Sequence, residues 1–553
     1  MAYNIQEATP ERIRLDQRYS ELKTLRSGAE QSLRDIQKYV RPNGGSFDNL
    51  AKSMGSVQED GSKNICDPTA VWACQMFANG LSSYLVPRSD RWAYFKPVGI
   101  PSAELTDEQL VYLEKVSDMM FHVLALPDSR FYQASHECFY DQGSYGTSVV
   151  YVKPTKTGTN FRSCPLGDCY FDVDDEDQVD TMYYRRFMRT SAFVKMFPQV
   201  MKFEDFDPKN MNRVFEVVYA VEPNRAPLAK KGGRLGSTRP YTAKYFCPDF
   251  KQILSEGHLS YFPFLVPRWT VISGEVWGRG PAHTCLASIE MINRMESVVI
   301  RAGEMAIEPP LTAEVDSILL PMKYGKRQIL WREPGMAAPE PVLSGTDPGI
   351  TMDRIQRHSD HINRAFFVDQ ILREQKKERQ SVLEIQDERG QMLQQLGPAL
   401  ARQETEFLDP AIDLTFNMLQ DKGWIEAPPA SLFDAKLELV YTSPAAHAQY
   451  ASRIADIHGF MGDITPLVQA DPTVMDEVNK NELLDHYARY RNLPRAIINT
   501  KKQADEIRAA RAEAEQQQQA MAAVPEMAGA MKDVASAKAT DPEGIGQMLG
   551  GMM

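Results

Sequence analysis

The sequence predicts an α+β fold in which helical segments lie toward both ends of the chain and a β-rich block lies between them. Apolar residues follow helical spacing through most of the first 140 residues or so and again after residue 281. From about residue 147 to about residue 270 the pattern changes to short runs rich in Val, Tyr and Phe. Helices and strands that occupy separate blocks are typical of the α+β class.

Composition narrows the possible function classes. The chain has 553 residues, enough for three to five domains at about 100–200 residues each. Its net charge of -12 excludes a protein that binds nucleic acid nonspecifically over its whole surface, although an acidic surface can guide DNA by repelling it. There is no run of about 18 apolar residues, so we expect no membrane span. The first residues lack the pattern of a secretion signal.

The cysteines predict free thiols. The chain has seven of them, an odd number, scattered between Cys66 and Cys285, which favours a reducing compartment over a disulfide framework. Cys164 and Cys169 have the spacing of half a zinc site, but no second pair lies nearby. We therefore expect no metal and no cofactor.

The first helices have clear start signals. Thr9-Pro10-Glu11 supplies a cap, a proline at the first helical position and an acid in the first turn. Four helices are expected, at residues 9–39, 67–84, 106–126 and 131–141. Strands are expected at residues 147–152, 183–187, 214–221, 241–246 and 261–268, which together form the β-rich block.

The second helical block begins after the glycines that precede Pro281. A helix over 282–305 carries apolar residues on more than one side, as a helix packed between neighbours would. Short strands and turns follow at 311–346, and a helix returns at about residue 350. A charged segment, 372–380, has no apolar face and should meet water or a polyanion. After it a long helix with a kink at Pro398 is expected.

The chain offers no motif that carries catalysis. It contains no P-loop, no HExxH, no Gly-x-Ser-x-Gly and no dinucleotide-binding fingerprint. The acidic run at Asp172, Asp174 and Asp177 lacks the glycine and glutamate of a calcium loop and is read as a polar hairpin turn. His358 and His361 lie one helical turn apart without a third ligand, so a polar helix face is favoured over a metal site.

Several blocks, in consistent order, resemble the head-to-tail connector, or portal, proteins of short-tailed, T7-like bacteriophages. They are the stretch from Asp67 to Trp92, the stretch from Phe131 to Thr147, Gly274 to Pro281 with the helix after it, and Arg379 to Ile385. The resemblance covers about residues 10–430. Trp277 stands where the family pattern has Tyr, and Ser381-Val382 where it has Thr-Ala; neither change threatens the fold.

The resemblance implies a portal-type subunit with a mainly helical wing and crown, a β-rich wing insert, a two-helix stem and a small α/β clip. The implied division is wing 1–270 with the β-rich insert at 147–270, first stem helix 271–306, clip 307–346, second stem helix 347–367, channel loop 368–381, long wing helix 382–440, crown 441–500 and an Ala/Gln/Met-rich tail 501–553, partly disordered. Such subunits form a closed ring, typically a dodecamer, at one capsid vertex of the virion, and they are not enzymes.

The resemblance also implies partners and site residues. The ring surrounds double-stranded DNA during packaging and ejection, binds the terminase, then the tail adaptor and tail, contacts the major capsid and scaffolding proteins, and assembles in the host cytoplasm. Three sets of residues are expected to act: the channel loop cations Arg373, Lys376, Lys377 and Arg379; the clip surface Lys323, Tyr324, Lys326, Arg327 and Trp331; and the stem contact Leu286, Ile289, Ile292, Met295 and Val299.

Two other readings stay open at the level of the sequence. One is a metal-dependent hydrolase that uses the Asp172–Asp177 cluster, and the other is a cytosolic helical scaffold. Only the portal reading requires a large closed ring, so native mass separates it from both.

Overall fold

A computed structural model describes the chain in segments. These are residues 9–42, 61, 65–89, 91–99, 105–200, 213–224, 239–250, 252–307, 311–312, 340–341, 348–369, 397–429, 432, 437–442, 457, 459–466, 468–469, 478, 483, 504 and 506–515. The chain divides into two compact units: Met1–Ser102 with Gln109–Met461, and Ala103–Glu108 with Gly462–Met553. The first unit holds nearly all of the described elements. In the second, residues 506–515 are helical and exposed.

The four helices expected in the first block are confirmed. They are α1 (Pro10–Val40), α3 (Thr69–Leu85), α4 (Asp107–Ala125) and α5 (Phe131–Tyr145). Thr9 caps α1, because its hydroxyl accepts a hydrogen bond from the Arg12 N–H. Helix α5 ends at Gly146, whose φ of 74° is left-handed and suits a glycine cap.

The β-rich block forms two antiparallel sheets. The five-stranded sheet has the order β4-β5-β6-β7-β8, with β4 at Cys169–Val173, β5 at Val179–Arg189, β6 at Val214–Pro223, β7 at Tyr241–Phe246 and β8 at Ile253–Leu259. The three-stranded sheet has the order β3-β2-β9, with β2 at Val149–Thr155, β3 at Gly158–Cys164 and β9 at Phe264–Leu265. The expected strand at 261–268 is thus shorter, and β3, β4 and β8 were not expected.

Helix α1 packs against the five-stranded sheet. The ring of Tyr19 lies edge-on to Tyr170 and Phe246 and stacks on Tyr183. Arg26 is almost completely buried there, and its guanidinium donates to the backbone carbonyls of Gly167 and Cys169. The short helix α6 (Thr190–Met196) adds a second small core beside β5 and β6.

A two-stranded sheet joins distant parts of the chain. Strand β1 (Ala93–Pro97) pairs with β12 (Leu437–Tyr441), with Ala93 opposite Tyr441. Trp92, fully buried beside this sheet, stacks on Phe131 and on Tyr441. The core of the unit therefore includes residues from both helical blocks and from the β-rich block.

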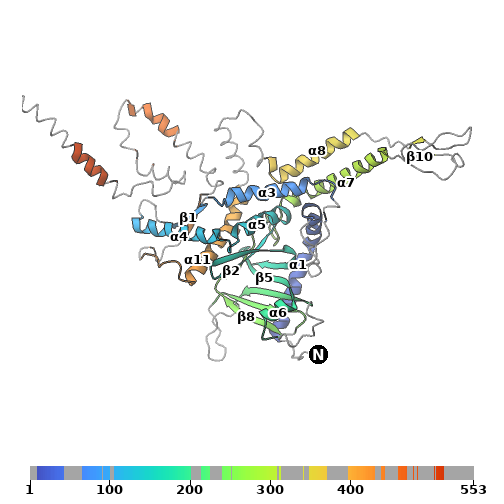
Figure 1. The fold of residues 1–553 in the computed structure, drawn as a ribbon, viewed down its shortest axis with the longest axis horizontal. Coiled ribbons are helices and arrows are strands. Elements are labelled where there is room, and N and C mark those ends of the chain that lie inside the picture. Colours follow the sequence, from blue (N-terminus) through green and yellow to red (C-terminus); the bar gives the residue numbers. More distant parts are fainter. Residues whose placement is uncertain are drawn as a thin grey trace, which may run out of the picture. The chain divides into compact units, whose positions relative to one another are not determined.

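Helices α7 (Pro281–Ile307) and α8 (Pro348–Ala365) run side by side, and the strand pair β10 (Leu311–Thr312) and β11 (Glu340–Pro341) lies beyond their paired ends (Figure 1). The chain thus leaves the body along α7 and returns along α8. Residues 397–403 are helical and continue through a π-helical segment, Glu404–Leu408, into α11 (Asp409–Asp421). Within the described residues, no helix is long and apolar enough to cross a membrane.

The acidic run is a hairpin turn, as expected. The carboxylate of Asp174 accepts hydrogen bonds from the backbone N–H groups of Glu176 and Gln178, and Asp172 pairs with Arg18. The cysteines are free thiols, and Cys164 and Cys169 are buried. His358 is half-buried and His361 is exposed on α8.

Candidate functional site: a helix pair on a locked base

Helix α7 starts where two backbones meet at glycines. A Cβ on Gly280 would overlap the carbonyl oxygen of Gln142, and a Cβ on Gly146 would overlap the backbone of Arg279 and Gly280. A Cβ on Gly278 would lie 2.5 Å from the Gly146 oxygen. Only glycine allows this approach, so the end of α5 fixes where α7 begins.

Hydrogen bonds hold the same contact. The Gly278 N–H donates to the Thr147 hydroxyl at 2.8 Å, and the Trp269 N–H donates to the Gly146 carbonyl at 2.8 Å. The Gly280 N–H donates to Nδ1 of His283 at 3.2 Å. Burial and the nearby Arg279 lower the pKa of His283 to about 4, so its imidazole is neutral and Nδ1 is free to accept.

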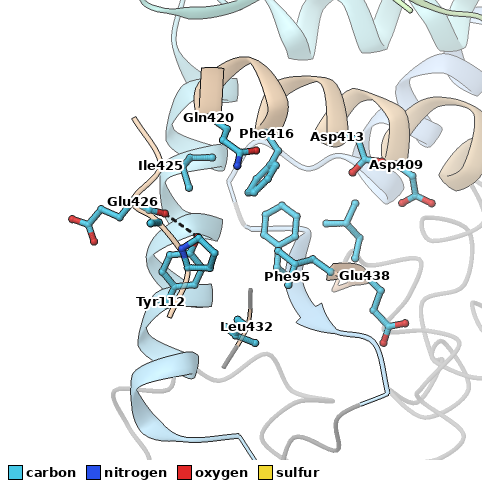
Figure 2. Close-up of a pocket in the computed structure, with 14 residues that line it drawn as sticks. Phe95, Tyr112, Asp409, Asp413, Phe416, Gln420, Ile425, Glu426, Leu432 and Glu438 are labelled. Atoms are coloured by element: carbon cyan, nitrogen blue, oxygen red, sulfur yellow. Dashed lines mark hydrogen bonds between the residues drawn. The ribbon is translucent and has the colours of Figure 1, made fainter. Parts of the chain in front are cut away.

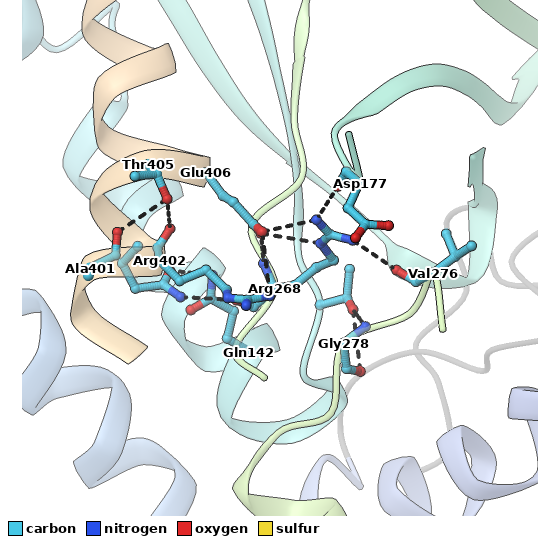
Figure 3. Close-up of polar contacts among 11 residues, drawn as sticks. Gln142, Asp177, Arg268, Val276, Gly278, Ala401, Arg402, Thr405 and Glu406 are labelled. Carbon is cyan, nitrogen blue, oxygen red and sulfur yellow. Dashed lines mark hydrogen bonds and ion pairs between the residues drawn. The ribbon is translucent and has the colours of Figure 1, made fainter. Parts of the chain in front are cut away.

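A buried arginine connects the start of α7, which we call its base (residues 278–283), to the helix that contains the π-helical segment. The Arg268 side chain, only 5% exposed, donates to Glu406 at 3.0 and 3.3 Å and to the carbonyls of Asp177 at 2.7 Å and Val276 at 3.5 Å (Figure 3). Its backbone N–H also donates to Glu406, at 2.8 Å. A charge this deep is stable only when it is paired and its donors are satisfied.

A pair of buried glutamines extends the network. Gln142 on α5 donates to the side-chain oxygen of Gln403 at 2.7 Å, and Gln403 donates to the Arg268 carbonyl at 3.4 Å. Glu406 follows Gln403 within the π-helical turn, a feature frequent at functional sites. The base of α7 is thus joined to α5, to the β-rich block and to the helix that leads into α11.

The proximal half of α7 is part of the core of the chain. Ile289 and Ile292 are fully buried, as are Ile362 in the last turn of α8 and Phe366 just after that helix. Phe366 contacts Phe77 on α3, edge-on. Two of the residues expected at a subunit contact, Ile289 and Ile292, are therefore covered by their own chain and leave no surface for a neighbour. Leu286, Met295 and Val299 are half-buried.

Helix α7 exposes apolar side chains in two opposite rows, which extend through its distal half. Met291, Val298 and Met305 recur every seven residues and are 42%, 52% and 53% exposed. Ile300 and Ile307 continue the side of Ile289 beyond the body, and Ile307 is 83% exposed. At 100° per residue these two rows lie roughly opposite each other. Single exposed apolar side chains are ordinary, but two rows on one helix indicate a covered surface.

A hollow of about 870 Å³ opens between α11 and the β1–β12 sheet (Figure 2). Phe95 and Phe416 contact each other in its apolar part, and four acids also line it: Asp409, Asp413, Glu426 and Glu438. Near Asp409, burial and that carboxylate raise the pKa of Glu404 to about 7. Tyr441 donates to Asp409 and links the acidic group to β12.

Two of the three predicted sets of site residues lie outside the described residues. These are the channel loop cations and the clip surface. The anchor Arg268 was not singled out from the sequence, although an arginine inside the apolar run Phe262–Trp269 is the kind of signal that indicates a buried ion pair. In the part of the chain that the structure describes, no three His, Cys, Asp or Glu side chains form a metal-binding group.

Comparisons with known proteins show the family of the chain. A family model described as bacteriophage head to tail connecting protein matches residues 12–498. The chain is 25% identical to the portal protein of Salmonella phage epsilon15 over 567 aligned positions, covering 97% of this chain and 98% of the relative. It is 24% identical to a protein named "probable portal protein" of Bordetella phage BPP-1, with 92% of each chain covered. The chain belongs to the family of bacteriophage head-to-tail connecting proteins.

Proposed function

We propose that this protein is the portal subunit of a short-tailed phage and forms a closed ring at one capsid vertex. The ring is the channel for double-stranded DNA during packaging and ejection, and it docks the terminase and later the tail. The metal-dependent hydrolase and the cytosolic scaffold are not favoured, because the chain belongs to the connector family and its Asp172–Asp177 cluster serves a hairpin turn.

The observation that carries the proposal is the distal half of α7. A ring is built from heterologous contacts, in which each subunit offers two different surfaces to its two neighbours. The row Met291, Val298 and Met305 and the opposite row Ile300 and Ile307 supply two such surfaces on one helix. We therefore move the proposed stem contact from Ile289 and Ile292 to these exposed rows, and keep Leu286, Met295 and Val299 as half-buried flanking positions.

The finer features stay part of this proposal. A dodecamer is the expected ring size. Arg373, Lys376, Lys377 and Arg379 are proposed to meet DNA phosphates in the channel, where alternating Glu374 and Glu378 keep the contacts weak. The residues Lys323, Tyr324, Lys326, Arg327 and Trp331 are proposed to meet the packaging motor and the tail adaptor. Capsid and scaffolding proteins are the remaining partners, in the virion and during assembly in the host cytoplasm.

Val298→Asp tests the ring. We expect wild-type protein to give a large closed ring by native mass and electron microscopy, and we expect the variant to remain as single subunits or small oligomers. The physical reason is that a carboxylate at the contact would have to be buried without a partner. Isolated subunits of the variant and of the wild type should have the same melting temperature, because Val298 is exposed within its own chain.

The control is Ser191→Asp, which adds the same charge at an exposed position on α6. This control should form rings at the wild-type yield. If Val298→Asp forms complete rings at that yield, the proposed stem contact is wrong. If the wild-type protein stays monomeric at all concentrations, the proposed portal function is wrong.

A further inference from the structure

A second hollow, of about 1010 Å³, opens to solvent at the hairpin of β2 and β3. Its lining is mostly positive, whereas the whole chain has a net charge of -12. Four cations line it: Arg130, Lys153, Lys156 and Arg162. We call it the basic groove. Its other lining residues are polar or small, namely Pro127, Asp128, Thr155, Thr157 and Asn160, and none of them is aromatic.

The strand register explains how the cations gather. Lys153 pairs with Asn160 and Tyr151 with Arg162, so Lys153 and Arg162 lie on the same face of the hairpin at diagonal positions, and both are exposed. Residues diagonal to each other on such a pair lie about 7–8 Å apart at Cα. Lys156 stands in the two-residue turn between Thr155 and Gly158.

The loop before α5 is fixed against this hairpin and brings the fourth cation. The Phe161 N–H donates to the Ser129 carbonyl at 2.8 Å, and the Asn160 amide donates to the Asp128 carbonyl at 2.6 Å. These bonds hold Arg130 in a left-handed conformation, with φ of 54°, at the start of α5. The groove is therefore a built arrangement of three segments.

The part of the chain that the structure describes brings no ion-pair partner to these four cations. Among the described residues none of them forms an ion pair, whereas many other arginines of the body do. Asp128 is the acid in the groove, and its carboxylate already accepts a hydrogen bond from Thr157 at 3.0 Å. Lys422, the residue that follows α11, adds a further positive charge next to the hairpin, where its ammonium donates to the carbonyls of Thr155 and Gly158.

We propose that the basic groove binds the phosphate backbone of double-stranded nucleic acid, at a site separate from the channel loop. Several unpaired cations, spaced several ångströms apart in an open groove, suit a repeating phosphate backbone. Proteins that hold single strands stack the bases on aromatic side chains, and this groove is lined by none. Protein interfaces centre on aromatic or large apolar residues, whereas Pro127 is the one apolar residue among the described residues that line this groove.

The inference goes beyond the portal function, because it needs neither the ring nor the channel. A subunit that failed to form rings would still present the groove. Conversely, a portal ring could package DNA with this groove serving no ligand. Failure of one proposal is therefore distinguishable from failure of the other when mass and duplex binding are measured on the same samples.

The experiment measures binding of a fluorescent duplex of about 20 base pairs and mixed sequence to the full-length protein at several salt concentrations. We expect wild-type affinity to fall with salt, with a log–log slope of about -3 for three to four phosphate contacts. The variant Lys153→Ser/Lys156→Ser/Arg162→Ser should lose at least about tenfold in affinity, and its slope should shrink by about one for each cation removed.

Three matched variants isolate the groove. Lys38→Ser/Lys115→Ser/Lys195→Ser removes the same charge from exposed positions on α1, α4 and α6 and should bind as wild type. Lys153→Arg/Lys156→Arg/Arg162→Lys keeps the charge and should bind as wild type. Replacing Arg373, Lys376, Lys377 and Arg379 together by Ser removes the channel loop cations and should leave the groove's contribution in place.

Several results would overturn the proposal. One is wild-type affinity in Lys153→Ser/Lys156→Ser/Arg162→Ser, and another is an equal loss in the Lys38, Lys115 and Lys195 control. The others are loss of all duplex binding when the four channel loop cations are replaced, and loss of binding when Lys and Arg are exchanged in the groove. Tighter binding of a single-stranded oligonucleotide would replace it by a single-strand site. Tighter binding of a polyglutamate peptide would replace it by an acidic protein partner. Unchanged melting temperatures for the groove variant ensure that lost affinity reports the groove.

Discussion

The two halves of helix α7 contrast in how their apolar residues are used. In the proximal half, Ile289 and Ile292 are fully buried in the subunit, above a base where glycines, Arg268 and two glutamines fix the backbone. In the distal half, Val298, Met305 and Ile307 are exposed. The apolar residues at the start of α7 therefore stabilise the subunit. In our proposal, those toward its end stabilise the ring.

The contrast teaches that an apolar residue on a helix does not reveal which surface covers it. Burial by the chain's own core and burial by a neighbouring copy require the same residue types. Substitutions in the proximal half should therefore unfold the subunit, and substitutions in the distal half should separate subunits. The stability of the isolated subunit distinguishes the two cases.

Gly280→Ala should have the largest effect. The added Cβ would overlap the backbone carbonyl oxygen of Gln142, and a backbone atom cannot move aside as a flexible side chain can. We expect a loss of more than about 4 kcal/mol in the free energy of unfolding, or no soluble folded subunit. Urea unfolding followed by circular dichroism measures it.

The matched control is Gly303→Ala, in the distal half of the same helix. No atom lies within 4 Å of a Cβ built there, so helix propensity should decide the outcome. We expect a gain of about 0.5–1 kcal/mol. If both alanines had similar effects, the base would not be locked in the way the glycine contacts indicate.

Arg268→Met should come next. The substitution leaves the Glu406 carboxylate without its main partner and removes the donor to two carbonyls. Breaking a buried pair from one side costs about 3–5 kcal/mol. The double variant Arg268→Met/Glu406→Gln should recover part of that loss, because it leaves no unpaired charge. The side-chain oxygen of the new glutamine can still accept from the backbone N–H of residue 268. Equal stability of the single and double variants would contradict this account.

Glu404→Gln should give a smaller effect that depends on pH. The pKa of Glu404 is raised to about 7 in the folded chain, above its usual value, so the folded state binds the proton more tightly than the unfolded state. Stability then falls as pH rises through the interval up to about 7. The glutamine variant should match wild type near pH 4 and exceed it by about 2 kcal/mol near pH 8, which is less than the full pKa shift implies because water screens this half-buried side chain. Melting temperatures across this range test the sign, and parallel profiles for the two proteins would exclude the raised pKa.

The local signals in the sequence predicted the secondary structure well where they were strong. Thr9-Pro10 and Asp67-Pro68-Thr69 started the helices α1 and α3, and β7 has the predicted bounds of Tyr241 and Phe246. Strands β3, β4 and β8 were missed, because glycines or cysteines interrupt their alternation. The π-helical turn at Glu404–Leu408 has no local signal that distinguishes it from an α-helix.

The α+β class, the β-rich block and the resemblance to portal proteins follow from the sequence alone, because they depend on local spacing and on the order of motifs. The pairing of Ala93 with Tyr441, the ion pair of Arg268 with Glu406 and the place of Ile292 in the subunit core are visible only in the folded chain. Those facts depend on which surfaces meet across hundreds of residues. Apolar spacing shows that a face is covered, whereas the folded chain shows what covers it.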